Sequence, residues 1–289
     1  MSAYPWYRLA QWATGTLPRR VCWSMAEALA DVQWRCSPKD RAAVQANLSV
    51  IAGGPVSSDA SAVREVFRNF ARYLVEFMGA HRLTRPAPTV EGTEEVGAAL
   101  RPYRGAIMLS AHLGNWELGA VALHRLGFQT GAVVLPHRDA RVNQFFDRQR
   151  LRCGVEPIPL GAGAMAQCLQ RLREGWLLGL VGDREFGAGG VTVSFFGHSV
   201  TMPRGPALLS LRSGAPAVPV FVIREGPWRL RFHVGDVVPP PAEARDASQV
   251  VALTQRYARI MEGVIRRYPS QWLMFQPLFQ NRASSTPHV

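Results

Sequence analysis

Residues 105–127 read GAIMLSAHLGNWELGAVALHRLG and place a short apolar run directly before a histidine and a helix-like stretch. The run Gly105–Ala111 is typical of a buried strand, and Asn115–Leu126 has helical spacing and ends at Gly127. Further apolar runs lie at Ala132–Leu135, Val155–Leu160, Trp176–Val181, Val191–Phe196 and Ala217–Ile223, and further helical stretches at Arg141–Arg152, Ala164–Arg173 and Ala247–Arg267. This alternation predicts an α/β fold with a mainly parallel central sheet flanked by helices.

The first third of the chain has a different pattern. Residues 61–80 have helical spacing with one apolar face. Four of the eight tryptophans lie within the first 34 residues, interleaved with arginines. Such side chains suit the headgroup layer of a membrane, although they could also cover the core of the next domain. We expect residues 1–88 to be a helical portion that docks on a membrane and packs on a catalytic domain of residues 89–289, with the boundary at Arg85–Thr89.

The composition is that of a globular protein with a basic surface. The chain has 289 residues, of which 47% are hydrophobic and 19% charged, and this excludes disordered and fibrous classes. Its net charge of +12 should attract phosphates, carboxylates or an anionic membrane leaflet. No window reaches the ~18 uninterrupted apolar residues of a spanning helix, so we expect a protein that does not cross the membrane.

His112 and Glu117 are the first candidates for chemistry. His112 comes directly after the first apolar run, where the carboxyl end of a parallel strand commonly meets a ligand. On one continuous helix the two residues would be separated by roughly 140°, but they can meet if His112 lies in the turn before the helix. A carboxylate beside the ring would fix its tautomer and raise its basicity. A buried structural histidine is the alternative.

Residues 90–119, VEGTEEVGAALRPYRGAIMLSAHLGNWELG, resemble the bacterial lipid A late acyltransferases, the lauroyl and myristoyl transferases. These belong to the glycerolipid acyltransferase superfamily, which is marked by H-x4-D/E. The likeness continues through the helix ending at Arg150, the sequence GDRE at 182–185, FFGHSVTMPRGPA at 195–207 and YPSQWLMFQP at 268–277. The M-P-x-G-P-A run is also similar to phosphatidylinositol mannoside acyltransferases.

The resemblance implies an acyltransferase in which His112 is the general base and Glu117 its partner. His112 would take the proton from an acceptor hydroxyl as its oxygen attacks an acyl thioester. Backbone N–H groups at Leu113–Asn115 would stabilise the oxyanion. The residues expected to bind substrate are Asn115, Arg150 (with Arg148 as the alternative), Asp183, Arg184 and Arg204. Asp183 and Arg184 could instead form a structural ion pair, and Arg204 could simply belong to a loop.

The resemblance also implies partners and a location. We expect no cofactor or metal, an acyl carrier protein or coenzyme A thioester as donor, and a glycolipid acceptor such as a lipid A precursor. We expect a peripheral protein on the cytoplasmic face of the bacterial inner membrane that binds the lipid surface and no nucleic acid. The chain departs from the lipid A branch in lacking a hydrophobic N-terminal helix and in having GDRE in place of a DQD form.

Other functions compete with this interpretation. A serine hydrolase or thioesterase would need a nucleophile elbow, and no G-x-S-x-G occurs. A metallohydrolase lacks an HExxH or a clustered histidine set. A basic nucleic-acid-binding module would explain the charge, but no motif accompanies the dispersed arginines. A phosphatidylinositol mannoside or lysophospholipid acyltransferase and a non-catalytic lipid-binding relative remain alternatives.

Overall fold

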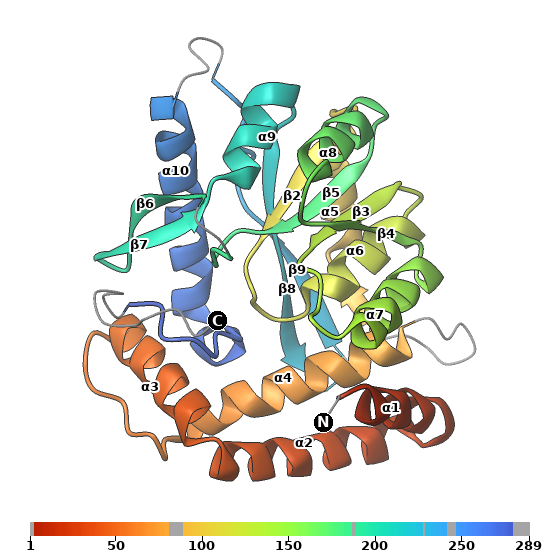
Figure 1. Cartoon of the computed structure of the whole chain (residues 1–289), viewed down its shortest axis with the longest axis vertical. Coiled ribbons are helices and arrows are strands. Elements are labelled where there is room, and N and C mark those ends of the chain that lie inside the picture. The colour runs from red at the N-terminus through yellow and green to blue at the C-terminus, as the bar shows by residue number, and fades with distance from the viewer. Residues whose placement is uncertain (1–2, 81–88, 187–188, 228, 242–246, 280–289) are drawn as a thin grey trace.

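The computed structural model describes residues 3–80, 89–186, 189–227, 229–241 and 247–279 (Figure 1). A seven-stranded sheet lies at its centre, in the order β1-β9-β8-β2-β5-β3-β4. Its strands are β1 (Thr89–Glu91), β2 (Ala106–Ser110), β3 (Thr130–Val134), β4 (Val155–Pro159), β5 (Leu177–Val181), β8 (Ala217–Gly226) and β9 (Arg229–Val234). Only the β8–β9 pair of this sheet is antiparallel. The predicted mainly parallel sheet is confirmed.

One predicted strand lies outside this sheet. The run Val191–Phe196 forms β6 (Gly190–Phe195), which pairs antiparallel with β7 (His198–Pro203) in a separate hairpin. The turn passes through Phe196 and Gly197, both with positive φ, as a tight two-residue hairpin requires. The hairpin packs on α10 (Ala247–Arg267), as Figure 1 shows.

Helices cover both faces of the sheet. The helices α5 (Thr93–Leu100) and α6 (Trp116–Arg125) bury apolar side chains against one face, which includes Met108 of β2. The helices α8 (Ala164–Arg173), α9 (Gly205–Ser213) and α10 pack on the opposite face, which includes Ile107 and Leu109. Successive side chains of β2 point to opposite faces of the sheet, and helices cover both faces, so every residue of β2 is buried. The helix α7 (Ala140–Arg152) follows β3 and lies against β4.

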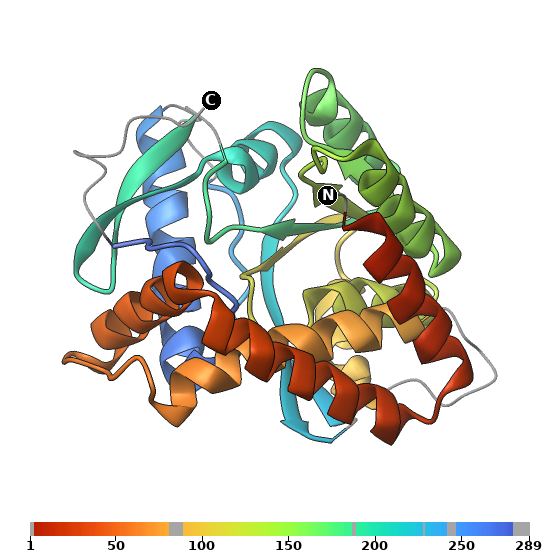
Figure 2. The same cartoon turned by 60° about the horizontal axis from the view of Figure 1, so that its bottom comes forward.

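The N-terminal residues form four helices, α1 (Tyr4–Thr16), α2 (Arg19–Cys36), α3 (Pro38–Ala52) and α4 (Ser61–Gly79). The helix α4 packs on the C-terminal segment that contains the short helix η1 (Pro269–Gln271), whereas α1 and α2 lie on the outside (Figure 2). Of the predicted boundary Arg85–Thr89, only Thr89 falls within the described residues, as the start of β1. In the described part of the chain, no helix is both long and apolar enough to cross a membrane.

Candidate active site

His112 and Asp183 follow two neighbouring strands of the sheet. Strands β2 and β5 pair in parallel with Ser110 opposite Val181, so the residues two positions beyond each strand end lie side by side. His112 Nδ1 lies 2.8 Å from Asp183 Oδ1, and the His112 backbone N–H donates to Asp183 Oδ2 at 2.9 Å. Open α/β sheets bind ligands at the carboxyl ends of their strands. The register of the sheet therefore builds a histidine–carboxylate pair where a substrate would bind.

The indole of Trp272 holds the same carboxylate. Its Nε1–H donates to Asp183 Oδ2 at 2.8 Å, and both side chains are almost fully buried. The backbone N–H of Leu273 donates to the carbonyl oxygen of His112 at 2.7 Å. The C-terminal segment thus fixes both members of the pair. Sequence reasoning found residues 268–277 only through a resemblance, because no local pattern places them beside the histidine.

Burial and hydrogen bonding act in opposite directions on the pKa of Asp183. Complete burial works to raise this pKa, but the facing His112 ring and the hydrogen bonds from His112 and Trp272 outweigh it and hold the pKa below its usual value. The ionised carboxylate accepts Nδ1–H, which leaves Nε2 as the ring atom that can take up a proton. The imidazole is 21% exposed and lines a cavity, so the ring can reach a bound substrate.

The carboxylate that orients His112 is Asp183, and the predicted contact between His112 and Glu117 is wrong. Glu117 lies in the first turn of α6 and faces α7, from which Arg150 donates through Nη2 at 2.5 Å and through Nε at 3.1 Å. The physical reason is the turn before α6. The chain passes through Gly114 at φ +64° against β8, which points the first helical carboxylate toward α7 and not back to the histidine.

Glu117 and Arg150 form a buried ion pair at the wall of the cavity. Their side chains are 6% and 10% exposed, respectively. Burial works to lower the pKa of Arg150, but the charge of Glu117 outweighs it and raises the pKa. Arg148, the alternative that the sequence left open, is exposed on α7. Of these two arginines it is therefore Arg150 that lines the cavity.

The backbone N–H groups expected to serve an oxyanion are engaged within the chain. Those of Leu113, Gly114 and Asn115 donate to the carbonyl oxygens of Ala111, Gln271 and Val222 at 2.6, 3.0 and 2.8 Å, respectively. A Cβ at Gly114 would lie 1.9 Å from the Val222 oxygen, so this close approach itself requires glycine. Ala111, the C-terminal segment and strand β8 each accept one of these three donors, so the structure lends the predicted oxyanion role no support.

Asn115 anchors the start of α6. Its Oδ1 accepts the backbone N–H of Leu118 at 3.2 Å, the standard N-cap bond, and its Nδ2 donates to Glu76 Oε2 at 2.8 Å. Glu76 is buried and also pairs with Arg224 of β8. No local sequence pattern signals Glu76 or Arg224, because the two partners lie on elements that are far apart in the chain.

The other two predicted substrate-binding residues lie apart. Arg184 follows Asp183 and lines the cavity, with its guanidinium over the ring of Phe186 at 4.6 Å. Arg204 occupies the position before α9 and is exposed, while its neighbours Pro203 and Gly205 line the cavity. Arg184 is thus part of the cavity wall, and Arg204 lies at the surface beside it.

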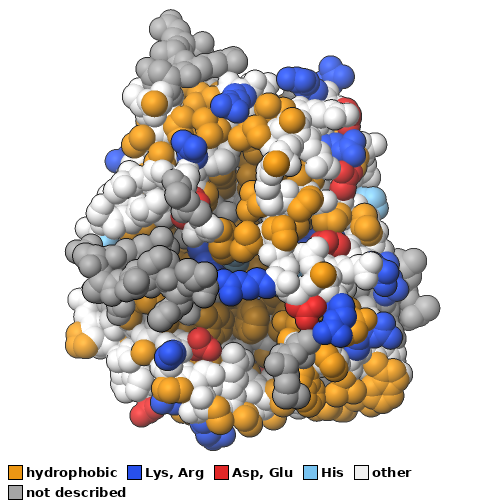
Figure 3. Space-filling view, in the orientation of Figure 1, with side chains coloured by type: hydrophobic (Ala, Val, Ile, Leu, Met, Phe, Trp, Pro, Cys, Tyr) orange, Lys and Arg blue, Asp and Glu red, His pale blue; other side chains and the backbone are white. Residues whose placement is uncertain are grey.

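A cavity of about 350 Å³ opens at His112. Its polar end holds the histidine, the Glu117–Arg150 pair and Arg184. From there it extends between α6 and the sheet, where its walls are apolar: Met108, Leu123, Ala132, Gly179, Val220 and Phe232. Figure 3, in the orientation of Figure 1, shows a hollow in the middle of the molecule with hydrophobic side chains around it and basic side chains within it. The site therefore joins a proton acceptor and cations to a narrow apolar space.

Comparison with known proteins identifies the family. The family model for bacterial lipid A biosynthesis acyltransferases matches residues 3–281. The chain belongs to this family. It is an acyltransferase, and the resemblance seen in the sequence is confirmed.

The chain is also similar to mycobacterial acyltransferases. The chain is 28% identical over 241 residues to a phosphatidylinositol mannoside acyltransferase of Mycolicibacterium smegmatis, covering 80% of this chain and 77% of the relative. It is 30% identical over 220 residues to the phosphatidylinositol mannoside acyltransferases of two strains of Mycobacterium tuberculosis, covering 74% of this chain and 65% of those proteins. The similarity to that branch, suggested by the M-P-x-G-P-A run, is confirmed.

Proposed function

We propose that this acyltransferase moves a fatty acyl chain from a thioester of acyl carrier protein or coenzyme A to a hydroxyl group of a membrane glycolipid. The observation that carries the proposal is the His112–Asp183 pair at the polar end of an apolar cavity. Apolar cavities with a few converging polar groups are the usual form of a small-molecule site. The thioester is already activated, so the reaction needs no further cofactor.

His112 acts as the general base. Its Nε2 takes the proton of the acceptor hydroxyl while the oxygen attacks the thioester carbonyl carbon. The tetrahedral intermediate then collapses, the C–S bond breaks, the ester forms, and the leaving thiolate takes the proton from the imidazolium. Asp183 stabilises the imidazolium through Nδ1–H. A positioned base of this kind accelerates a reaction by about 10²–10⁴-fold.

The cations at the polar end bind the charged parts of the substrates. Glu117 holds the Arg150 guanidinium at the cavity wall, where it can contact the oxyanion or a polar group of the acceptor. Arg184 lies beside the base and contacts the glycolipid headgroup. Asn115 fixes the start of the helix that carries Glu117. Arg204, exposed beside the cavity rim, meets a phosphate of the donor or acceptor.

The acceptor is a phosphate-bearing glycolipid. The mycobacterial relatives are named for acylating phosphatidylinositol mannosides, and this chain shares their family and carries a net charge of +12. A phosphatidylinositol mannoside or a lipid A precursor combines sugar hydroxyls with phosphate, and both groups suit a site with arginines around a base. The similarity to the mycobacterial proteins favours a phosphatidylinositol mannoside as the acceptor.

The helices α1 and α2 dock the enzyme on the lipid surface. Large apolar side chains point outward from both: Trp6, Leu9 and Trp12 of α1 and Val21, Met25, Leu29 and Val32 of α2. On α2 these positions form one stripe of a helix whose other side faces the protein. Exposed arginines lie on the same two helices, at Arg8, Arg20 and Arg35. Apolar side chains beside cations suit the interface of an anionic leaflet.

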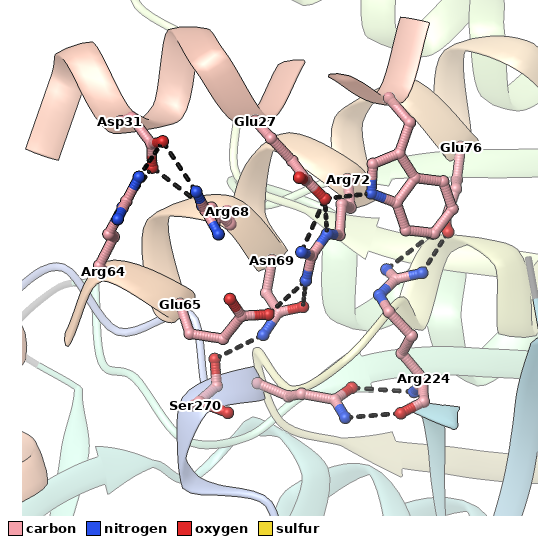
Figure 4. A network of polar contacts seen from close by, with 12 residues as sticks. Glu27, Asp31, Arg64, Glu65, Arg68, Asn69, Arg72, Glu76, Arg224 and Ser270 are labelled. Carbon is pink, nitrogen blue, oxygen red and sulfur yellow. Dashed lines mark hydrogen bonds and ion pairs between the residues drawn. The ribbon is translucent and has the colours of Figure 1, made fainter. Parts of the chain in front are cut away.

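The inner face of α2 combines the small buried residues Cys22, Ala26 and Ala30 with charged side chains that pair with α4, whereas its large apolar side chains lie on the outer face. Figure 4 shows Asp31 between Arg64 and Arg68 of α4, with hydrogen bonds of 2.9 and 2.8 Å from Arg68. Glu27 pairs with Arg72 at 2.7 Å in the same way. These ion pairs and the small buried side chains hold α2 to the protein, so the large apolar side chains of its outer face are left for another partner. We propose that this partner is the cytoplasmic leaflet of the inner membrane.

Only part of the tryptophan-rich segment belongs to this docking surface. The guanidinium groups of Arg72 and Arg224 lie 5.7 and 5.3 Å from the centre of the Trp23 ring. Three arginines lie within 6 Å of the Trp34 ring. The four tryptophans therefore divide into two that point outward, Trp6 and Trp12, and two that hold α2 to the protein.

Introducing charge into the outer stripe of α2 should weaken membrane binding. The double variant Met25→Glu/Leu29→Glu should bind vesicles of phosphatidylcholine and phosphatidylglycerol at least about tenfold more weakly, because each side chain loses 1.5–3 kcal/mol of apolar burial. Both positions are exposed, so the melting temperature should stay close to that of the wild type. Vesicle sedimentation measures the binding.

The matched control for docking is Val251→Glu/Ala252→Glu. It adds the same two charges at exposed positions at the start of α10, on the other side of the molecule from α2 (Figure 1). This variant should bind vesicles like the wild type. Equal binding by the α2 variant and the wild type would show that α1 and α2 are not the docking surface.

The transfer reaction tests the proposed function. Wild-type protein incubated with a labelled acyl thioester and a bacterial lipid extract should produce a new acylated glycolipid, identified by mass spectrometry. Release of free fatty acid alone would indicate a thioesterase. Absence of thioester consumption would support a lipid-binding relative.

A further inference from the structure

The apolar cavity runs along the strands from their ends toward their beginnings. Leu177, Gly179 and Val181 of β5 share one face because side chains alternate along a strand, and all three line the cavity. Val181 lies at the polar end beside Ser110, and Leu177 lies at the far end beside Thr130. At about 3.3 Å per residue, Gly179 is about 7 Å below Val181, and Leu177 is about 7 Å deeper still.

Small residues keep the middle of the cavity open. Gly179 pairs with Ala132 of β3, so a glycine and an alanine lie next to one another on this face. Across the cavity, α6 contributes Gly119 and Ala120 to the wall. Space between the helix and the sheet remains because these positions hold so few atoms.

The backbone does not require glycine at position 179. Its φ lies outside the left-handed region, and among the described residues a Cβ there would contact only the Gly131 carbonyl oxygen, at 3.6 Å. The neighbouring glycines differ. A Cβ at Gly131 would lie 3.0 Å from Leu178 Cδ2, and one at Gly119 would lie 2.9 Å from Val222 Cγ2. Of these three, therefore, only Gly179 would accept a Cβ at ordinary contact distance.

This open position works against stability. Glycine inside a strand is roughly 0.5–1 kcal/mol less favourable than alanine, and unfilled apolar space destabilises a fold further. A Cβ at position 179 would meet the backbone only at ordinary contact distance among the described residues, so the fold itself does not forbid a side chain there. A ligand that binds in this space explains why glycine is present there, whereas the stability of the unliganded protein does not.

We infer that Gly179 sets the length of the acyl chain that this enzyme transfers. The inference rests on the proposed function, because it takes the ligand in the cavity to be the acyl chain of the donor. With the thioester carbonyl beside His112, the chain extends past Val181 and Gly179 toward Leu177. A larger residue at position 179 would stand in its path and leave room only for a shorter chain.

Enlarging position 179 should shorten the preferred donor. Decanoyl, lauroyl, myristoyl and palmitoyl thioesters would be offered to the wild type, Gly179→Ala and Gly179→Leu, and initial rates of transfer measured for each. For each protein, the rate with the longest donor that the wild type uses is divided by the rate with the shortest donor. This ratio should be about tenfold or more lower in Gly179→Leu than in the wild type, which is the effect of one methylene that does not fit. The ratio for Gly179→Ala should lie between those of the wild type and Gly179→Leu.

A control shows that the effect belongs to the cavity. Gly263→Leu adds the same side chain at an exposed position of α10, where among the described residues a Cβ meets nothing within 4 Å, and it should keep the wild-type profile. An unchanged profile of Gly179→Leu, or an equal loss with every donor, would overturn the inference. Absence of transfer by the wild type would instead overturn the proposed function.

Discussion

Replacing Asp183 by asparagine should lower the rate of acyl transfer by roughly 10⁴-fold, the loss that the same exchange causes in a serine-protease triad. The contacts of Asp183 explain why. Oδ2 accepts two hydrogen bonds, from the backbone N–H of His112 and from Trp272, whereas among the described residues Oδ1 accepts from His112 Nδ1 alone. The asparagine oxygen would keep the two bonds, and its NH₂ group would then face Nδ1. The ring would be driven into the Nε2–H tautomer, in which Nε2 cannot accept a proton.

The comparison variant for Asp183→Asn is Trp272→Phe. It removes one donor to the carboxylate but keeps an aromatic ring beside Phe195, and it keeps the charge that sets the tautomer. Its loss of rate should be far smaller, because one hydrogen bond to a charged group contributes about 1.5–3 kcal/mol. Steady-state rates together with melting temperatures measure both variants. A folded Asp183→Asn enzyme with a wild-type rate would show that Asp183 does not control the base.

Replacing Arg150 by methionine should lower the free energy of unfolding by about 3–5 kcal/mol, because it leaves the Glu117 carboxylate buried without its partner. Both side chains are at least nine-tenths buried, so water compensates little of this loss. Denaturant unfolding measures the change. Unfolding that matches the wild type would show that the pair does not hold α6 to α7.

A second variant separates the structural role of this pair from its role in the reaction. Glu117→Leu/Arg150→Met replaces both charges by apolar side chains of similar size, and such exchanges are often neutral or stabilising. We expect this double variant to recover stability and to remain impaired in transfer, because the cation at the cavity wall is still missing. Recovery of full transfer along with stability would show that Arg150 acts only in holding the fold.

Much of the fold could be predicted because its signals are local. Strand–helix alternation and the glycines that end the helices lie in continuous stretches, and they predicted the parallel sheet. The hairpin β6–β7 was missed as a separate unit. An apolar run does not show which strands it will pair with, and Val191–Phe196 has the composition of a sheet strand.

The site was only partly predictable because its contacts depend on strand order. His112 could be found from its place after a strand, and Glu117 appeared to be its partner because it is near in sequence. The true partner, Asp183, follows a strand that comes later in the chain but returns to lie beside β2. Trp272 is more distant still. Resemblance to a family named Asp183 as a site residue but did not show what it contacts.

The orientation of α2 could not be predicted from its pattern of residues. An amphipathic helix ordinarily turns its apolar face to the core. Here Glu27 and Asp31 meet arginines of α4, and that pairing turns Met25 and Leu29 outward. The arginines that determine the orientation of α2 lie on another helix, so the sequence of α2 alone does not show which of its faces packs on the protein.

The role of His112 as the general base is tested by measuring acyl transfer by the wild type and by His112→Ala side by side. Each protein is incubated with a labelled acyl thioester and total bacterial lipid, and mass spectrometry quantifies acylated glycolipid and free fatty acid. We expect a new acylated glycolipid with the wild type, a loss of transfer of at least about 10²-fold with His112→Ala, and closely similar melting temperatures. Transfer by His112→Ala at the wild-type rate would show that His112 is not the general base.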